Sequence, residues 1–347
     1  MKLLPIDYPV IQAPMQGITS PEMVAAVSNS GGLGSLPLGG LSSEKALELI
    51  RKTKMLTDKP FAVNLFAHTN PVINEKVAKT MSHYIERLGE KFQIPFTSQP
   101  IEQLQFHSYE EQIGVILSEN LKIVSFTFGL LNDKSIRQLK NNHVILIGTA
   151  TCLEEARLLE GKGIDMIIAQ GIEAGGHRGS FLEDSPLPLL HLHSLLSLIV
   201  KNTSLPVIAS GGLADKQAIQ AVLKLGARGI QAGTAFIASN ESLAPPSYKA
   251  ALKLAAENGT ILTRSFSGRW ARSIRNRFIE EIEKSGLEIP EYPIQNSLTT
   301  PLRTTAKQMD NKDFISLYAG MSAHKSQQAP AAAICKQLIS DVGKYPL

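Results

Sequence analysis

The chain has 347 residues, of which 43% are hydrophobic and 19% are charged, and its formal net charge at neutral pH is +4. This length accommodates two ordinary domains or one large α/β barrel with an extension, and it suffices to bury a full hydrophobic core. The 35 basic and 31 acidic residues are too evenly balanced to indicate a nucleic-acid partner.

Cysteine content and hydropathy restrict the cellular setting. Cys152 and Cys335 are too few for a disulfide framework or a four-thiolate zinc site, so we interpret both as free thiols in a reducing compartment. The first seven residues lack the apolar stretch of a signal peptide, and the most apolar window, 187–200, is too short to span a bilayer. We expect a cytoplasmic protein without a membrane partner, and a homodimer remains open.

Short apolar runs alternate with amphipathic helical patterns along the first two-thirds of the chain. The predicted strands are 10–13, 32–36, 61–65, 123–128, 144–148, 166–170, 207–210 and 229–233. Most of these runs are continuously apolar, which is typical of parallel strands covered on both faces. Glycines and polar residues follow many of the predicted strands. In a doubly wound sheet they would gather at the one point where the strand order reverses, so this distribution favours a (β/α)8 TIM barrel.

Two regions depart from this alternation. Residues 67–120 contain helical pieces and no obvious strand, so we interpret them as an elaborated loop of a barrel that spans residues 1–236. Residues 237–305 have proline-interrupted helical patterns and are expected to form a helical accessory region that covers the barrel mouth. Residues 306–347 are expected to form C-terminal helices that return to the barrel.

The most informative segment is the glycine-rich stretch 169–179, at the end of the sixth predicted strand. Barrel enzymes keep their reacting groups at this end of the strands. Gly175 and Gly176 allow the backbone to approach a planar or anionic ligand closely. His177 is the one side chain of this loop that ordinarily titrates near neutral pH, so a catalytic role is favoured over a surface histidine in a turn.

Two further loops follow the seventh and eighth predicted strands. Their candidate ligand-binding residues are Gly211 and Gly212, then Gln231, Ala232, Gly233 and Thr234. Loops at these positions commonly bind phosphate through backbone N–H groups, so a phosphorylated ligand or cofactor is predicted. The alternative is a pair of purely structural turns.

Amide side chains end three of the predicted strands, at Gln12, Asn64 and Gln170. An amide both donates and accepts hydrogen bonds, which suits the edge of a heteroaromatic ring. Ala13, Pro14 and Met15 follow Gln12, and the thioether of Met15 offers a soft apolar surface to a flat ring. Buried amides bonded to the backbone are the alternative.

An arginine-rich stretch at 264–277 includes Phe266 and Trp270, a mixture also found in nucleic-acid-binding proteins. We disfavour that interpretation because the whole chain is nearly neutral. If the stretch is helical, Arg269 and Arg272 lie on one side of the helix. Metal binding has little support, because no His, Cys or carboxylate cluster has ligand spacing.

Taken together, these segments resemble the nitronate monooxygenase family, formerly called 2-nitropropane dioxygenases, and its class I branch in particular. The matching stretches are 9–15, 25–34, 171–179, 206–212, 231–236, 267–269 and 276–278. The resemblance implies a barrel that holds non-covalent FMN under a smaller helical region. It implies that Asn64, Gln170, Gly175, Gly212 and the 231–234 loop contact FMN, and that His177 is the active-site histidine.

The chain departs from the family pattern at two places. Lys216 and Gln217 follow Asp215 where the family often has Gly-Arg, and Met321 stands where the family usually has Gln. The first change should leave phosphate binding through the backbone intact. The second change affects the roof contacts and the substrate preference that the resemblance implies.

The resemblance implies oxidation of alkyl nitronates, such as propionate 3-nitronate, with O2 to a carbonyl compound and nitrite-type products. The alternative is an FMN-dependent NAD(P)H oxidoreductase of the enoyl-acyl-carrier-protein reductase or quinone reductase type. Those enzymes tend to have Gly-Gly-Met after the first strand, whereas this chain has Ala13-Pro14-Met15. A third alternative is a flavin-free barrel that binds a phosphorylated metabolite.

Overall fold

The computed structural model describes residues 4–182 and 186–343. The first three residues of the predicted barrel region, residues 183–185 within it and the last four residues of the predicted C-terminal region lie outside the described part.

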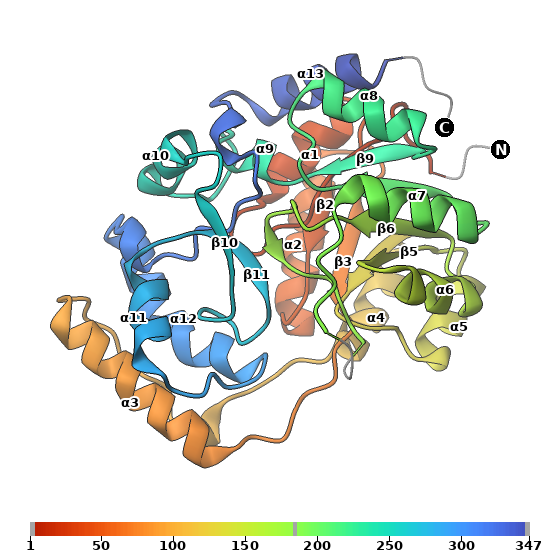
Figure 1. Cartoon of the computed structure of the whole chain (residues 1–347). Coiled ribbons are helices and arrows are strands. Elements are labelled where there is room, and N and C mark those ends of the chain that lie inside the picture. Colours follow the sequence, from red (N-terminus) through yellow and green to blue (C-terminus); the bar gives the residue numbers. More distant parts are fainter. Residues whose placement is uncertain (1–3, 183–185, 344–347) are drawn as a thin grey trace.

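Within these residues, eight parallel strands form one sheet in the order β1-β9-β8-β6-β5-β4-β3-β2. They are β1 (Val10–Gln12), β2 (Ser35–Pro37), β3 (Ala62–Phe66), β4 (Ile123–Thr127), β5 (Ile145–Ala150), β6 (Met166–Gln170), β8 (Val207–Ser210) and β9 (Gly229–Ala232). A parallel bridge between Ile11 and Leu33 joins the two edges of this sheet. The predicted (β/α)8 barrel is therefore confirmed (Figure 1).

Helices surround the barrel. They are α1 (Pro21–Asn29), α2 (Ser43–Leu56), α4 (Tyr109–Ser118), α5 (Asp133–Asn141), α6 (Leu153–Gly161), α7 (Leu192–Asn202), α8 (Lys216–Lys224) and α13 (Ala331–Val342). Side chains that cap backbone N–H groups begin several of them, such as Ser20 at α1 and Asp215 at α8. The C-terminal helix α13 packs against both α8 and α1, and so completes the ring of helices.

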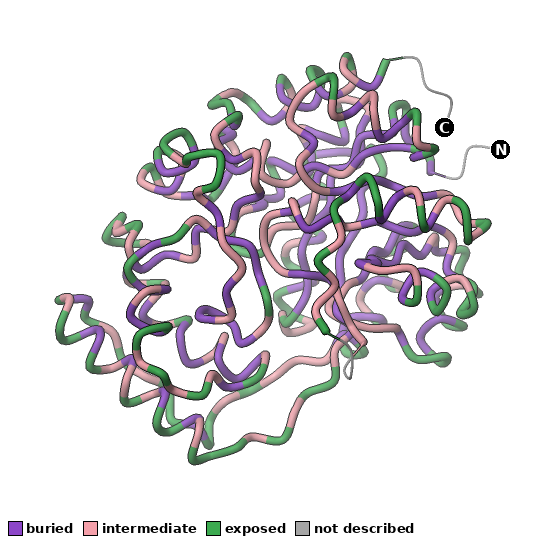
Figure 2. The backbone as a smooth tube through the Cα atoms, in the orientation of Figure 1, coloured by how far each residue is buried: buried purple, intermediate pink, exposed green. Residues whose placement is uncertain are grey.

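The strands are buried because each is covered on both faces. Their outward side chains pack under the helices in one large core, and a second core fills the barrel interior with residues such as Ile11, Ile147 and Ile208. Figure 2 shows the buried residues concentrated in the barrel and on the inner sides of the helices. The continuous apolar runs of the sequence reflect this double burial.

The long loop after β3 contains α3 (Glu75–Lys91) and the 3-10 turn η1 (Ile101–Gln103) before it returns at α4. Helix α3 packs on α12 (Ile294–Gln308), which is far away in the sequence. In Figure 1, α3 lies at the outer edge of the molecule. The loop therefore belongs to the roof over the barrel mouth as much as to the barrel.

The rest of the roof, which we call the cap (residues 238–330), lies between β9 and α13. It follows the short helix α9 (Thr234–Ile237), and its helical elements are α10 (Pro246–Leu254), α11 (Arg277–Ser285), α12, η2 (Lys312–Phe314) and η3 (Ala323–Lys325). Instead of helices alone, the segment 237–305 also contains the antiparallel pair β10 (Thr260–Thr263) and β11 (Ala271–Ile274). Arg269 and Arg272 consequently lie on a hairpin and not on one side of a helix.

Candidate active site

A cavity of about 430 Å³ lies at the carboxyl ends of the strands, under the cap. Its volume falls in the usual range for small-molecule sites, and its position is the one that barrel enzymes use. Every predicted site residue except Gln12 lines it. They are Ala13, Pro14, Met15, Asn64, Gln170, Gly175, Gly176, His177, Gly211, Gly212, Gln231, Ala232, Gly233 and Thr234.

The side chain of Gln12 has a structural role instead of the predicted one at a ring edge. It is fully buried, and its Nε2 donates to Thr19 Oγ1 at 3.0 Å while its Oε1 accepts the Ser35 N–H at 3.0 Å. The bond to Ser35 ties β1 to β2 where the barrel closes, and the bond to Thr19 fixes the loop before α1. The alternative of a buried amide bonded within the protein is therefore correct for Gln12.

The other two amides line the cavity but also have partners in the protein. Gln170 Nε2 donates to the carbonyl of His177 at 3.0 Å, and its Oε1 accepts the Gly179 N–H at 2.8 Å. Asn64 Nδ2 donates to Ser125 Oγ at 2.9 Å. Gln170 thus shapes the loop that carries His177, and each amide keeps some hydrogen-bonding capacity toward the cavity.

Backbone glycines form the wall of the cavity beside β8 and β9. Gly212 has φ +68°, and a Cβ built there would lie 3.2 Å from Glu173 Cβ, so the turn requires glycine. Gly176 has φ +74°, and a Cβ there would meet no atom within 4 Å. Since Gly176 lines the cavity, that space is available to a ligand that lies against the backbone.

His177 is held between the barrel and the cap. It forms β7 (Gly176–His177), which pairs with β11 through Ala271. Its Nε2 lies 2.8 Å from Ser267 Oγ, and its ring contacts Tyr318 at 5.0 Å and Phe128 at 5.5 Å between centroids. Burial, together with the cations Arg269 and Arg303, lowers the pKa of His177 to about 3. The imidazole is therefore neutral at physiological pH.

Two arginines and two tyrosines of the cap complete this end of the site. The Arg269 guanidinium lies 4.4 Å from the centre of the Phe128 ring, and Tyr292 contacts both Phe128 and His177 edge-on. Burial raises the pKa of Tyr292 and of Tyr318, so both phenols stay protonated.

Arg303, on α12, is a half-buried cation in the wall of the cavity, and desolvation lowers the pKa of its guanidinium. Its guanidinium donates to neutral groups, namely Asn296 Oδ1 at 2.8 Å, Thr300 Oγ1 at 2.9 Å and Ser316 Oγ at 3.2 Å. Among the described residues, no carboxylate forms an ion pair with it. A partly desolvated charge without a counterion is costly, so the site favours an anionic ligand.

Sequence reasoning did not find Tyr292, Arg303 or Tyr318. Each lies in the cap, and no spacing along the chain relates any of them to the glycine-rich loops. One signal was present, since the resemblance included Ser267 and Arg269. Met321 is not among the residues that line the cavity, although its backbone N–H donates to the carbonyl of Glu173 at 3.0 Å.

A fully buried arginine lies behind the histidine. Arg178 donates through its two terminal nitrogens to the carbonyls of Gly171 at 2.6 Å and Gln170 at 3.1 Å. Its backbone N–H donates to Trp270 O at 2.8 Å. These bonds fix the course of the loop on both sides of His177, so Arg178 supports the site without reaching the cavity.

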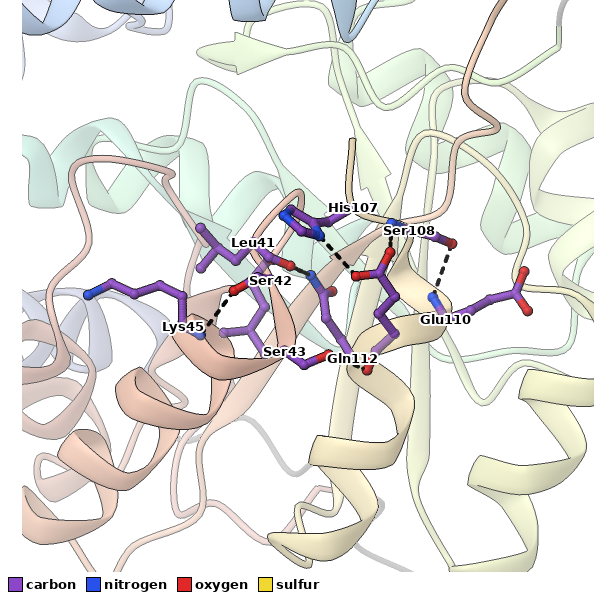
Figure 3. Close-up of polar contacts among 10 residues, drawn as sticks. Leu41, Ser42, Ser43, Lys45, His107, Ser108, Glu110 and Gln112 are labelled. Carbon is purple, nitrogen blue, oxygen red and sulfur yellow. Dashed lines mark hydrogen bonds and ion pairs between the residues drawn. The ribbon is translucent and has the colours of Figure 1, made fainter. Parts of the chain in front are cut away.

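The mouth of the cavity includes Gln105, Phe106 and His107, where the long loop returns to the barrel. Gln112, in α4, fastens this return by donating through Nε2 to Leu38 O at 2.8 Å and Leu41 O at 2.6 Å. Figure 3 shows Gln112 reaching from α4 to Leu41, with His107 and Ser108 above it. The loop after β2 and the start of α4 are thereby joined beside the cavity.

No cluster of metal ligands and no membrane-spanning helix is found in residues 4–182 and 186–343. They contain no group of three or more His, Cys, Asp or Glu side chains placed to hold a metal ion. No helix in these residues combines the length and apolar character needed to cross a membrane.

The fold and the site together define a barrel enzyme in which a neutral histidine and half-buried cations lie at a cavity under a cap. Comparison with known proteins specifies which kind. The model of the nitronate monooxygenase family matches residues 1–342. The chain therefore belongs to the nitronate monooxygenase family, which is a family of flavin-dependent oxidoreductases.

Curated relatives agree with this assignment. A probable nitronate monooxygenase of Staphylococcus saprophyticus is 39% identical over 345 residues, covering 99% of this chain and 96% of the relative. A probable nitronate monooxygenase of Staphylococcus aureus (strain MRSA252) is 37% identical over 345 residues, with the same shares covered.

Solved structures are similar over nearly the whole chain. A nitroalkane oxidase from Streptomyces ansochromogenes is 33% identical with a TM-score of 0.89, over 98% of this chain and 97% of that one. FabK from Thermotoga maritima is 26% identical with a TM-score of 0.76, over 98% of this chain and 94% of that one.

Proposed function

We propose that this enzyme carries out FMN-dependent oxidation of alkyl nitronates, such as propionate 3-nitronate, with O2, giving a carbonyl compound and nitrite-type products. The observation that carries the proposal is the pairing of a neutral His177 with the half-buried Arg303 cation in one cavity. This pairing suits a small anionic substrate. The names of the relatives, probable nitronate monooxygenase and nitroalkane oxidase, support the same choice.

The residues of the cavity fit FMN. The open space at Gly176 accommodates a flat ring against the backbone, and the turn at Gly211 and Gly212 offers a cradle for phosphate. We assign the phosphate end to Gly211, Gly212 and the loop of Gln231, Ala232, Gly233 and Thr234. We assign the ring to Ala13, Pro14, Met15, Asn64, Gln170, Gly175 and Gly176. When bound, FMN supplies the electron transfer and the chemistry with O2.

The protein contributes binding and orientation of the substrate. His177, being neutral, offers one N–H donor to the nitro oxygens, and Arg303 balances the negative charge of the nitronate. Phe128, Tyr292 and Tyr318 surround the imidazole and exclude water from it. An imidazole with such a low pKa is a weak base, so a nitronate that is already deprotonated suits the site better than a neutral nitroalkane.

Replacing His177 with Asn tests this division of roles. We expect the variant only to weaken in its use of nitronates, because Asn still donates a hydrogen bond to the nitro oxygens. Complete loss of kcat/KM with the nitronate of 2-nitropropane would contradict the assignment.

The second candidate function is an FMN-dependent NAD(P)H oxidoreductase, favoured by the similarity to FabK. To separate the two, the flavin-loaded enzyme is mixed without oxygen with propionate 3-nitronate and, separately, with NADH. Rapid loss of the oxidised flavin absorbance with the nitronate, and little change with NADH, is expected. Fast bleaching by NADH with no response to the nitronate would assign the enzyme to the reductases.

We also propose a cytoplasmic location, because both Cys152 and Cys335 are free thiols in the described structure. Fractionation of cells that express the tagged protein tests this directly.

A further inference from the structure

Ser267 connects the cap to the histidine of the site. It lies in the turn between β10 and β11, its side chain is buried, and its Oγ is 2.8 Å from His177 Nε2. No other side chain among the described residues forms a hydrogen bond with the imidazole. The proton arrangement between these two atoms therefore determines what His177 presents to the cavity.

The distances around Ser267 indicate which atom donates. The hydroxyl has one hydrogen and accepts the Arg269 N–H at 3.3 Å. Its own hydrogen has two acceptors within reach, His177 Nε2 at 2.8 Å and Arg269 O at 3.3 Å. The contact with Nε2 is 0.5 Å shorter than the contact with Arg269 O, so we assign the hydrogen to Nε2.

The Tyr318 hydroxyl also interacts with the Ser267 hydroxyl. Because burial keeps the phenol protonated, Tyr318 is placed to donate to Ser267 Oγ instead of taking its hydrogen. A donating Arg269 N–H also polarises the Ser267 hydroxyl in the direction of Nε2, which strengthens the chain of bonds. Nε2 is then an acceptor and carries no proton.

The proton of the neutral imidazole must therefore be on Nδ1. Nδ1 forms no hydrogen bond with the described residues, and protein atoms do not enclose it fully. His177 lines the cavity, so its Nδ1–H is available to a ligand there.

We propose that Ser267 is a positioning residue that holds His177 as the Nδ1–H tautomer, so that the imidazole donates a hydrogen bond to an anionic substrate. The identity of the substrate rests on the proposed function, whereas the tautomer does not. In the opposite tautomer, the Nδ1 lone pair would face the substrate anion, and the contact would be repulsive.

The tautomer can be observed without turnover. In the flavin-loaded enzyme labelled with ¹⁵N at the histidine rings, His177→Asn identifies the His177 signals, and the ¹⁵N shifts report which nitrogen is protonated. We expect Nδ1 protonated and Nε2 bare in the unmodified enzyme, and a mixture of tautomers in Ser267→Ala. A protonated Nε2 in the unmodified enzyme, or an unchanged spectrum in Ser267→Ala, would overturn the proposal.

Kinetics give the second test. Ser267→Ala is expected to lower kcat/KM for propionate 3-nitronate about 10- to 100-fold, because much of the imidazole then adopts the wrong tautomer. Ser267→Thr keeps the hydroxyl and is expected to restore both the spectrum and most of the activity. Loss of activity in Ser267→Thr, with the tautomer restored, would contradict the link between the tautomer and rate.

The matched control is Ser265→Ala. Ser265 is equally buried in the same turn, but its hydroxyl bonds with Thr263 and does not contact His177. This variant is expected to keep the spectrum and activity, so a loss there would assign the effect to packing. If the unmodified enzyme does not use nitronates, the proposed function fails, and the ¹⁵N spectra still decide the role of Ser267.

Discussion

The titration of His177 offers a quantitative check on the site. Its pKa of about 3 in the folded protein compares with an ordinary value of 6.5. The unfolded chain therefore binds a proton between pH 6.5 and 3 that the folded protein does not bind. Stability falls as the pH decreases through this window, and it is unaffected by His177 above pH 6.5.

The magnitude follows from the difference between the folded and unfolded states. At pH 5 the unfolded histidine is about 1.5 pH units below its pKa, and each unit corresponds to about 1.36 kcal/mol. The upper limit is thus about 2 kcal/mol between pH 8 and pH 5. Water in the cavity screens part of this, so we expect about 1–2 kcal/mol.

The assay is urea denaturation at pH 8, 6.5 and 5 for the unmodified protein and for His177→Asn. Carboxylates that titrate in the same range affect both proteins, so the difference between the two curves isolates His177. The unmodified protein should lose about 1–2 kcal/mol more than the variant. Parallel curves would show that the imidazole titrates normally and that the surrounding cations do not act on it.

Three further substitutions test the packing and charge of the site. Gly175→Ala places a Cβ 2.4 Å from Gly320 N, so it should lower the free energy of unfolding by about 1–3 kcal/mol and reduce flavin content, measured by urea denaturation and absorbance. Gly114→Ala, exposed in α4 with no atom within 4 Å of the new Cβ, should stabilise by about 0.5–1 kcal/mol in the same assay. Arg303→Met removes the half-buried cation and should raise the nitronate KM about 10- to 100-fold, measured in steady-state kinetics.

Each of these has a contrary outcome. Normal stability in Gly175→Ala would mean that the loop and the cap are not in close contact. Destabilisation in Gly114→Ala would mean that α4 is packed against something at that face. An unchanged KM in Arg303→Met would remove the argument for an anionic substrate.

The barrel was predictable because its strands have a local signature. The strand Val207–Ser210 begins with three apolar residues in a row and is buried throughout, and it occupies the predicted residues. The glycine-rich loops were predictable for a related reason, since backbone conformation and close approach restrict the residue type. Gly212, at φ +68°, is such a position.

The rest of the site depends on contacts that no local pattern encodes. Gln12 ends a strand as Asn64 does, but its amide is occupied by Thr19 and Ser35, which are known only once the chain is folded. The hairpin of β10 and β11 was missed because two four-residue strands are too short to show an alternation. Arg303 and Tyr318 reach the cavity only through the packing of the cap.

The position of α13 has a consequence for how the chain folds as it is made. This helix fills the gap between α1 and α8, yet the whole cap is synthesised between it and β9. A nascent chain that has emerged as far as β9 has all eight strands but lacks the helix that covers β1, with which α13 is in contact. Coverage of β1 therefore waits until α13 has left the ribosome, and by then the whole cap segment has been synthesised.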